Sequence, residues 1–184
     1  MANRIASLVA GLAVAVSLMF AAPYVFAERS AGEALDDSTV QASVKAALAE
    51  SDAVKARSIN LETYQGNVIL AGFVESDAER AAAEQVAESV EGMKQVTNGL
   101  VVSAPDRSAG QVLDDQTIET KVKAALIGDE VADAREVNVE VRRNVVLLSG
   151  FTESKEEKVR AGEVARGVKG VEDVAHMVVV KPGN

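Results

Sequence analysis

Two pairs of adjacent carboxylates are the first residues of this sequence whose type and spacing could support chemistry. Asp36-Asp37 and Asp114-Asp115 could act as an acid and a base, or could supply oxygen ligands to a calcium ion. Neither pair is followed by the spacing of an EF-hand loop. Acidic residues at the start of a helix are favoured by the helix dipole and accept hydrogen bonds from free N–H groups. We therefore expect both pairs to cap helices.

His176 is the single histidine among 184 residues, and the sequence contains no cysteine. A zinc site needs several His, Cys or acidic ligands in a defined spacing, and a Ser-His-Asp triad needs partners that no motif here supplies. We expect His176 to have a structural or surface role. Because no nucleophile–base pair is recognisable either, the sequence predicts a protein without catalytic activity, metal or cofactor.

Gly72 and Gly150 could allow a phosphate group to approach the backbone closely. Neither stands in the glycine-rich loop between a strand and a helix that P-loop and Rossmann sites require. Glycine at the end of a strand more often permits a β-bulge or a positive φ angle. We therefore expect a structural role for both glycines.

The elements that must position these residues occur twice in the chain. A shift of 78 residues aligns the sequence with itself without a gap, and places V-K-A-A-L at 44–48 and 122–126 and G-F-x-E-S at 72–76 and 150–154. Self-similarity at this long spacing indicates two tandem copies of one small domain, because solenoid repeats are shorter. The two acidic pairs and the two glycines are thus equivalent positions of the two copies.

Hydrophobic periodicity changes in the same order in each copy. Apolar residues first recur with a helical spacing, then alternate in two segments joined by turn residues, return to a helical spacing, and end in a valine-rich strand. Ser76 and Ser154 are each followed three residues later by glutamate, the signature of a capping box that opens the second helix. The predicted order is α-β-β-α-β. Two helices packed on a three-stranded sheet form an α+β domain, here present in tandem.

Composition changes along the chain set the expected domain boundaries. Arg4, the apolar stretch that follows it and the small residues before Glu28 are typical of a secretory signal peptide over 1–27, cleaved after Ala27, although an uncleaved anchor is the alternative. We expect an N-terminal linker over 28–34, a first domain over 35–103, a linker over 104–112, a second domain over 113–181 and a tail over 182–184. For a bacterial protein this organisation predicts a soluble periplasmic location, with no transmembrane segment after cleavage.

The repeated unit resembles the BON domain. The resemblance rests on the V-K-A-A-L helix, on the hairpin that ends in L-x-G-F-x-E-S, and on the passage G-V-x-x-V into the last strand, which the second copy has at 170–174 and the first copy replaces with Gly92-Met93-Lys94-Gln95-Val96. The characteristic glycine of the family falls at Gly72 and Gly150. The resemblance implies a non-enzymatic periplasmic protein linked to osmotic or envelope stress. It also implies either contact with phospholipid interfaces or a chaperone-like association with exported proteins.

Charge distinguishes the two copies. The formal net charge is −9; residues 28–104 contain 6 basic and 13 acidic residues, and residues 105–184 contain 12 and 15. The expected second helix of the second copy carries a basic stripe composed of Lys155, Lys158, Arg166 and Lys169, where the first copy has Asp77, Arg80, Glu88 and Glu91. This stripe could contact anionic lipid headgroups. The alternative is a solvated face whose cations pair with nearby acids, namely Glu156, Glu157, Glu163 and Glu172.

Two functions remain open. The acidic balance argues against nucleic acid as a partner, because nucleic-acid-binding proteins need Lys and Arg to displace counterions. The first hypothesis is a stress-related binding protein that is chaperone-like toward unfolded or exported envelope proteins and keeps its complexes soluble through its negative charge. The second is an envelope adaptor that binds an anionic phospholipid surface through its second domain.

Overall fold

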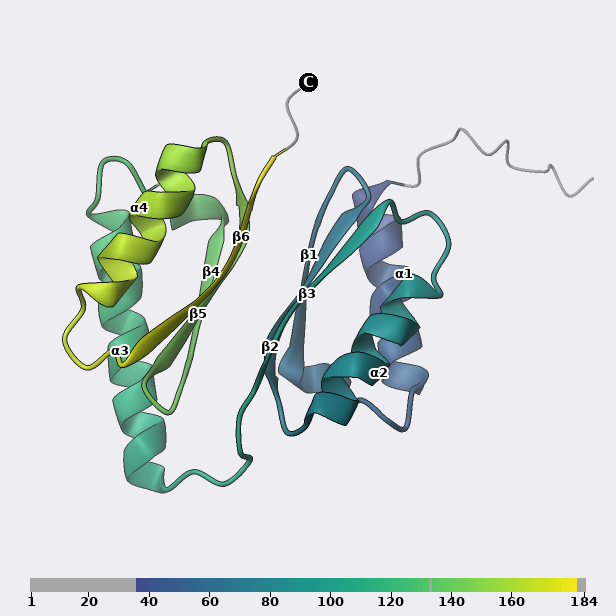
Figure 1. The fold of residues 1–184 in the computed structure, drawn as a ribbon, viewed down its shortest axis with the longest axis horizontal. Coiled ribbons are helices and arrows are strands. Elements are labelled where there is room, and N and C mark those ends of the chain that lie inside the picture. Colours follow the sequence, from purple (N-terminus) through teal and green to yellow (C-terminus); the bar gives the residue numbers. More distant parts are fainter. Residues whose placement is uncertain (1–35, 133, 182–184) are drawn as a thin grey trace, which may run out of the picture. The chain divides into compact units, whose positions relative to one another are not determined.

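The computed structural model describes residues 36–132 and 134–181, and for Ala134 only the backbone. The predicted signal peptide (1–27), the N-terminal linker (28–34) and the tail (182–184) lie outside the described residues. The first repeat comprises α1 (Asp37–Glu50), β1 (Ile59–Tyr64), β2 (Asn67–Val74), α2 (Asp77–Glu88) and β3 (Gln95–Val102). The second comprises α3 (Ala109–Ile127), β4 (Val137–Arg142), β5 (Val145–Thr152), α4 (Lys155–Arg166) and β6 (Asp173–Val180) (Figure 1). The predicted order α-β-β-α-β is confirmed in both repeats.

Each repeat contains a three-stranded sheet with the second strand in the middle. The strand orders are β1-β2-β3 and β4-β5-β6; the first pair in each sheet is antiparallel and the second pair is parallel. The parallel pair needs a crossover connection, which α2 and α4 supply. The 3₁₀ helices η1 (Ala56–Ser58) and η2 (Ala134–Glu136) lead into β1 and β4, and the sequence patterns did not predict them.

The second helix of each repeat begins at the predicted serine, but the accompanying glutamate behaves differently from a capping box. The hydroxyl oxygens of Ser76 and Ser154 each accept a hydrogen bond at 3.1 Å from the N–H group three residues later. The carboxylate of Glu79 accepts from the N–H groups of Glu75 and Lys55. It therefore bonds the residue before the cap, and it links α2 to the loop that follows α1.

The first helices do not begin as the acidic pairs predicted. Asp36 is the N-cap residue of α1, but its side chain makes no capping hydrogen bond. α3 begins at Ala109, where Ser108 and Gln111 form a reciprocal capping box. Asp114 and Asp115 therefore lie inside α3, and the end of the segment 104–112, predicted as a linker, is helical. The first acidic pair therefore stands at the start of a helix as expected, but without a capping hydrogen bond, and the expectation that the second pair caps a helix is wrong.

Each repeat buries its core between the helices and the inner face of its sheet. α1 contributes Val40, Val44 and Leu48 at the i, i+4, i+8 spacing of a helical stripe, and α3 contributes the equivalent residues Ile118, Val122 and Leu126. Leu48 and Leu126 are both 1% exposed. Removing such a side chain typically costs about 2–5 kcal/mol, which is large beside the roughly 4–10 kcal/mol expected for a domain of this size.

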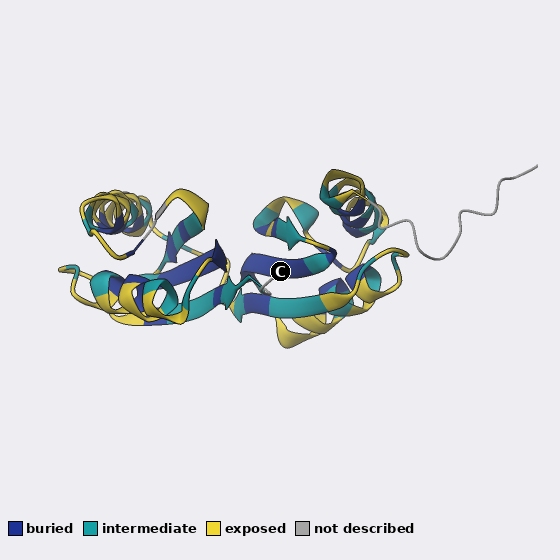
Figure 2. Cartoon of the chain, turned by 90° about the horizontal axis from the view of Figure 1, so that it is seen from above, coloured by how far each residue is buried: buried dark blue, intermediate teal, exposed yellow. Residues whose placement is uncertain are grey.

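The central strands are buried on both faces. All residues from 68 to 74 of β2 and from 146 to 152 of β5 are buried. Their outward-facing residues form a third apolar cluster within the compact unit of residues 33–184, composed of Ile69, Ala71, Phe73, Leu147 and Phe151. A continuous apolar run is typical of a strand covered on both sides. Figure 2 shows burial concentrated in the strands and exposure on the outer faces of the helices.

Candidate functional site

The second aspartate of each acidic pair holds a hairpin turn. The Asp37 carboxylate accepts hydrogen bonds from the backbone N–H groups of Gln65 and Gly66, at 2.7 and 2.8 Å. These two residues have φ angles of 49° and 78°, as a type I′ turn requires at both central positions. Asp36 is exposed, whereas Asp37 points to the turn. The adjacent carboxylates therefore share no site that could work as an acid–base pair.

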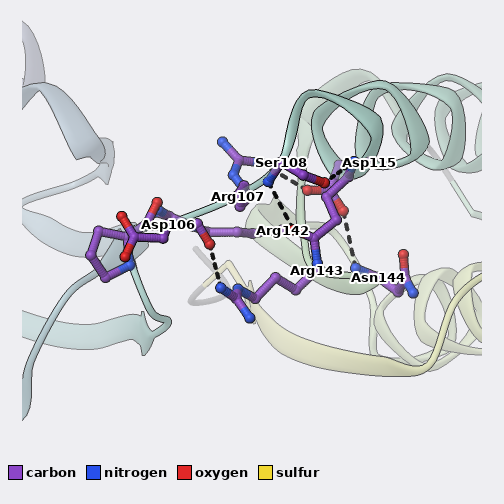
Figure 3. Close-up of polar contacts among 9 residues, drawn as sticks. Asp106, Arg107, Ser108, Asp115, Arg142, Arg143 and Asn144 are labelled. Atoms are coloured by element: carbon purple, nitrogen blue, oxygen red, sulfur yellow. Dashed lines mark hydrogen bonds and ion pairs between the residues drawn. The ribbon is translucent and has the colours of Figure 1, made fainter.

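Asp115 has the same role in the second repeat, where an arginine joins it (Figure 3). Its Oδ1 atom accepts from the Asn144 N–H at 3.0 Å, and its Oδ2 atom pairs with Arg107 Nη1 at 2.8 Å. Burial alone would raise the pKa of Asp115, which is 2% exposed, but the hydrogen bonds from Asn144 and Arg107 lower it below 3.8. The ionised carboxylate thus links α3, the β4–β5 turn and the connecting segment, which is the stretch 103–108 between β3 and α3.

Two further arginines, at the end of β4 and in the turn that follows it, donate hydrogen bonds to the connecting segment. Arg142 Nη2 donates to the Pro105 carbonyl oxygen at 3.1 Å, and Arg143 donates to the Asp106 carbonyl oxygen (Figure 3). Burial lowers the pKa of Arg142 below its ordinary value, and the positive charges of Arg107 and Arg143 lower it further. The first repeat has tyrosine and glutamine in place of Arg142 and Arg143. Their contacts with backbone oxygens give these arginines a structural role.

Gly72 and Gly150 occupy equivalent environments that exclude a side chain. Their φ angles are 139° and 129°, which L-residues rarely adopt. A Cβ atom on Gly72 would lie 2.1 Å from the Ser58 carbonyl oxygen, and one on Gly150 would lie 2.0 Å from the Glu136 carbonyl oxygen. The expected positive φ is confirmed, but both glycines lie within β2 and β5, not at a strand end. The close approach is made by the chain's own backbone, so no phosphate is needed to account for these glycines.

His176 connects β6 to α4. Its Nε2 atom lies 2.8 Å from the Lys158 carbonyl oxygen, which accepts a hydrogen bond from the ring. Burial lowers the pKa of His176 below 6.5, and the charges of Lys158 and Arg166 lower it further. Asn98, the equivalent residue of the first repeat, donates to the Arg80 carbonyl oxygen at 3.1 Å. The strand-to-helix contact is therefore common to both repeats, whereas the ring and its basic surroundings belong to the second.

The basic stripe is only partly helical. Lys155, Lys158 and Arg166 belong to α4, but the helix ends at Arg166, and Lys169 lies in the turn that follows Gly167. The prediction that α4 carries all four cations is wrong, because glycine ends the helix earlier than a continuous 100° periodicity assumes.

The alternative interpretation expected the cations of the stripe to pair with the nearby acids, but these acids have other partners. Glu157 accepts from the Glu153 N–H, Glu163 pairs with Arg160 at 3.2 Å, and Glu172 accepts from the Asn144 amide. In the part of the chain that the structure describes, no ion pair involves the four cations of the stripe.

Two exposed aliphatic residues lie near the stripe, a third is exposed at the end of α3, and the sequence patterns did not single them out. Ile127, Val131 and Val159 are 76%, 49% and 59% exposed. Val131 and Val159 line a hollow of about 370 Å³ together with Lys155, Glu156, Arg160 and Glu163. The first repeat has alanine at all three equivalent positions, namely Ala49, Ala53 and Ala81. A residue-by-residue comparison of the two copies would have revealed this difference.

An ion pair fixes the loop that carries Val131. Asp129 pairs with Arg160 of α4 at 2.8 Å and accepts hydrogen bonds from the N–H groups of Val131 and Ala132. The Arg160 side chain and these N–H groups lower the pKa of Asp129 to about 2. The first repeat has serine and alanine in place of Asp129 and Arg160. The loop is thus held against α4 by a contact particular to the second repeat.

Within 36–132 and 134–181, no group of three His, Cys, Asp or Glu residues is placed so that it could hold a metal ion. None of the helices in these two ranges combines the length and apolar character that a membrane span requires.

A family model matches both repeats of the chain. The model of the BON domain covers residues 36–104 and 114–182, which are the two α-β-β-α-β units described above. The chain belongs to the BON domain family. BON domain 1 is the first repeat, and BON domain 2, which carries the basic stripe and the exposed aliphatic residues, is the second.

Two relatives, each with 75% of its length covered, support the same assignment. Osmotically-inducible protein Y of Escherichia coli K12 is 38% identical over 151 residues, which are 82% of this chain and 75% of that protein. Outer membrane lipoprotein DolP of Haemophilus influenzae is 32% identical over 149 residues, which are 79% of this chain and 75% of that protein. Among solved structures, CdsD, a structural protein of the type III secretion system of Chlamydia trachomatis, is similar with a TM-score of 0.33 and 14% identity, covering 82% of this chain and 66% of that chain.

Proposed function

We propose that this BON protein is a non-enzymatic envelope protein whose BON domain 2 binds the surface of membranes that contain anionic phospholipid. One observation carries the proposal. On the same scaffold, BON domain 2 has larger aliphatic residues where BON domain 1 has alanines, and it has cations at three surface positions where BON domain 1 has acids. The names of two relatives, an osmotically inducible protein and an outer membrane lipoprotein, support a role in the envelope under osmotic stress.

The aliphatic residues supply the apolar part of such a surface. Val131 and Val159 are exposed beside Lys155, and Ile127 is exposed at the end of α3. Complete burial of a Val or Ile side chain contributes about 1.5–3 kcal/mol. The pair between Asp129 and Arg160 neutralises charge at the edge of the hollow and fixes the loop that presents Val131.

The cations supply the electrostatic part. Lys155, Lys158, Arg166 and Lys169 have no carboxylate partner among the described residues, so their charge is available to a negative surface. Each Lys or Arg near an anionic membrane contributes about 1 kcal/mol. An amphipathic surface with aliphatic and basic residues is the pattern by which peripheral proteins lie on a membrane. Because this sequence contains no cysteine, contact with lipid would not depend on an acylated cysteine.

Co-sedimentation with vesicles tests the proposal. The protein should sediment with vesicles containing phosphatidylglycerol, should not sediment with pure phosphatidylcholine, and should be released by 0.5 M salt, a concentration of roughly the order that screens surface charge. Reversal of Lys155, Lys158, Arg166 and Lys169 to Glu should abolish binding, and Ile127→Ala with Val131→Ala and Val159→Ala should weaken it strongly. Reversal of the exposed cations Lys45 and Lys94 of BON domain 1 is the matched control and should leave binding unchanged. Equal binding by the reversed and unchanged proteins would refute the role of the stripe.

The chaperone-like role is a second candidate, because exposed Ile127, Val131 and Val159 could also contact apolar segments of unfolded envelope proteins. Light scattering of an unfolded outer-membrane protein, diluted from denaturant with near-stoichiometric amounts of this protein, tests it. Suppressed aggregation that is lost in the triple alanine variant but kept in the charge-reversed variant would support this role. No suppression across the titration would contradict it.

A further inference from the structure

The side chains of α4 and β6 converge on Gly162. Gly162 is buried, and a Cβ atom at this position would lie 2.8 Å from Cδ2 of His176 and 3.2 Å from Nη1 of Arg166. The Arg166 guanidinium thus lies back over the helix toward the His176 ring. Lys158 is on the same side of α4, and its charge acts on the ring as well.

BON domain 1 places a carboxylate at the equivalent point. Its residue 84 is glutamate where BON domain 2 has Gly162, and Asn98 Nδ2 donates to Glu84 Oε2 at 3.0 Å and to the Arg80 carbonyl oxygen at 3.1 Å. The strand residue of BON domain 1 therefore binds an anionic group that belongs to the chain itself. BON domain 2 keeps the bond from the strand to the helix, lacks this carboxylate, and surrounds its place with cations.

We propose that BON domain 2 binds the phosphate group of an anionic phospholipid between Arg166, Lys158 and His176, at the place that the Glu84 carboxylate occupies in BON domain 1. This site rests on the proposed function and identifies the part of the lipid that is recognised. A phosphodiester carries one negative charge, as a carboxylate does. Guanidinium groups bind phosphate oxygens by paired hydrogen bonds, and a Lys ammonium adds a compact charge.

The histidine makes binding depend on pH. Because a carbonyl oxygen only accepts, the Nε2 atom of His176 carries the hydrogen that is donated to Lys158, and the second proton would be taken up at Nδ1. The charged groups that act on the ring from α4 are Lys158 and Arg166, and both disfavour the protonated ring; the residue opposite His176 on β5, Leu148, has no charge. A bound phosphate offsets this repulsion and so favours the protonated ring. The affinity of BON domain 2 for the phosphate should therefore increase as the pH falls below 6.5 and His176 becomes protonated.

A transplant of the BON domain 1 pair is the sharpest test. Gly162→Glu combined with His176→Asn recreates the Glu84–Asn98 arrangement, which is accommodated in BON domain 1, and should reduce the affinity for phosphatidylglycerol vesicles at least about fivefold, the effect of one unit charge near such a surface. The reciprocal change in BON domain 1, Glu84→Gly with Asn98→His, is the matched control and should leave the affinity unchanged. Circular dichroism melting confirms that each variant is folded. Vesicle binding by the folded transplant equal to that of the unchanged protein would overturn the site.

The pH profile and free phosphate complete the test. The unchanged protein should bind the vesicles about fivefold more tightly at pH 5.5 than at pH 8, the effect of one added charge, whereas His176→Asn, which can keep the bond to the Lys158 carbonyl oxygen, should lose this dependence. An identical profile in His176→Asn would overturn the role of the histidine. Inorganic phosphate, followed by the NMR signals of the His176 ring, separates the sources. A shift at millimolar phosphate in a protein that binds no vesicles would overturn the lipid as ligand and the proposed function with it, whereas vesicle binding that persists in the transplant would overturn this site alone.

Discussion

Replacement of Gly150 by alanine should destabilise BON domain 2 by about 2–6 kcal/mol. Two effects add. A non-glycine residue held at a φ angle of 129° is strained by about 1–3 kcal/mol. The new Cβ atom would also lie 2.0 Å from the Glu136 carbonyl oxygen, so β5 and η2 must move apart. Overpacking that forces such backbone shifts costs about 1–3 kcal/mol.

Urea unfolding followed by far-ultraviolet circular dichroism measures this effect. The sequence has no tryptophan, so backbone dichroism is the appropriate probe. With a domain stability of roughly 4–10 kcal/mol, Gly150→Ala should shift the unfolding of BON domain 2 to much lower urea. Gly110→Ala is the matched control. Gly110 lies in α3, a Cβ atom there would have its nearest neighbour at 3.8 Å, and alanine is the better helix former by about 1 kcal/mol. An unfolding midpoint of Gly150→Ala equal to that of the unchanged protein would refute the close approach.

Three further substitutions have clear expected outcomes. Asp115→Asn should cost about 1.5–3 kcal/mol at pH 7, because the buried carboxylate loses its charge-assisted hydrogen bonds. The folded pKa of Asp115 lies below 3.8, so the stabilisation by its carboxylate is present above that pH and is lost as the pH falls through the folded pKa. Urea midpoints at about pH 3–7 should therefore show a weaker loss of stability in acid for Asp115→Asn than for the exposed control Asp114→Asn. Ser154→Ala should lower the melting temperature by removing the cap of α4, worth about 1 kcal/mol. Leu126→Ala should cost about 2–5 kcal/mol, whereas Ile127→Ala, one residue further along α3, should stay within about 0.5 kcal/mol in the same urea assay, and equal costs would contradict the assigned burial.

The order of elements could be predicted because hydrophobic periodicity records it twice. The stripe of Val122 and Leu126 belongs to a helix with one buried side, and the run at 145–148 belongs to a strand buried on both sides. The helix starts were harder to predict, because an aspartate at a chain reversal can cap its own helix or a neighbouring turn. Which N–H groups lie near Asp37 and Asp115 depends on where the hairpins fold back, and this is a tertiary contact.

The candidate site could be predicted only in part. The difference in charge between the copies is visible in the sequence, and the basic stripe inferred from it included Lys158 and Arg166 of α4. The convergence on Gly162 was not visible, because His176 is 14 residues away in sequence and meets α4 only through the packing of β6. The exposure of Ile127 was equally hidden, since an aliphatic residue beside Leu126 is indistinguishable from a core residue until the helix is packed.

Transfer of the surface from BON domain 2 to BON domain 1 tests the central claim most directly. The recipient chain would carry the triple alanine replacement of Ile127, Val131 and Val159, which should strongly weaken its binding to phosphatidylglycerol vesicles. Its BON domain 1, which already has Arg80 in place of Lys158, would then receive the equivalent aliphatic and basic residues through Ala49→Ile, Ala53→Val, Ala81→Val, Asp77→Lys, Glu88→Arg and Glu91→Lys. Because both domains share one scaffold, co-sedimentation should return to within about tenfold of the original affinity, which corresponds to about 1.4 kcal/mol. A folded recipient that still fails to bind, beside an original protein that does, would contradict the claim that these surface residues carry the function.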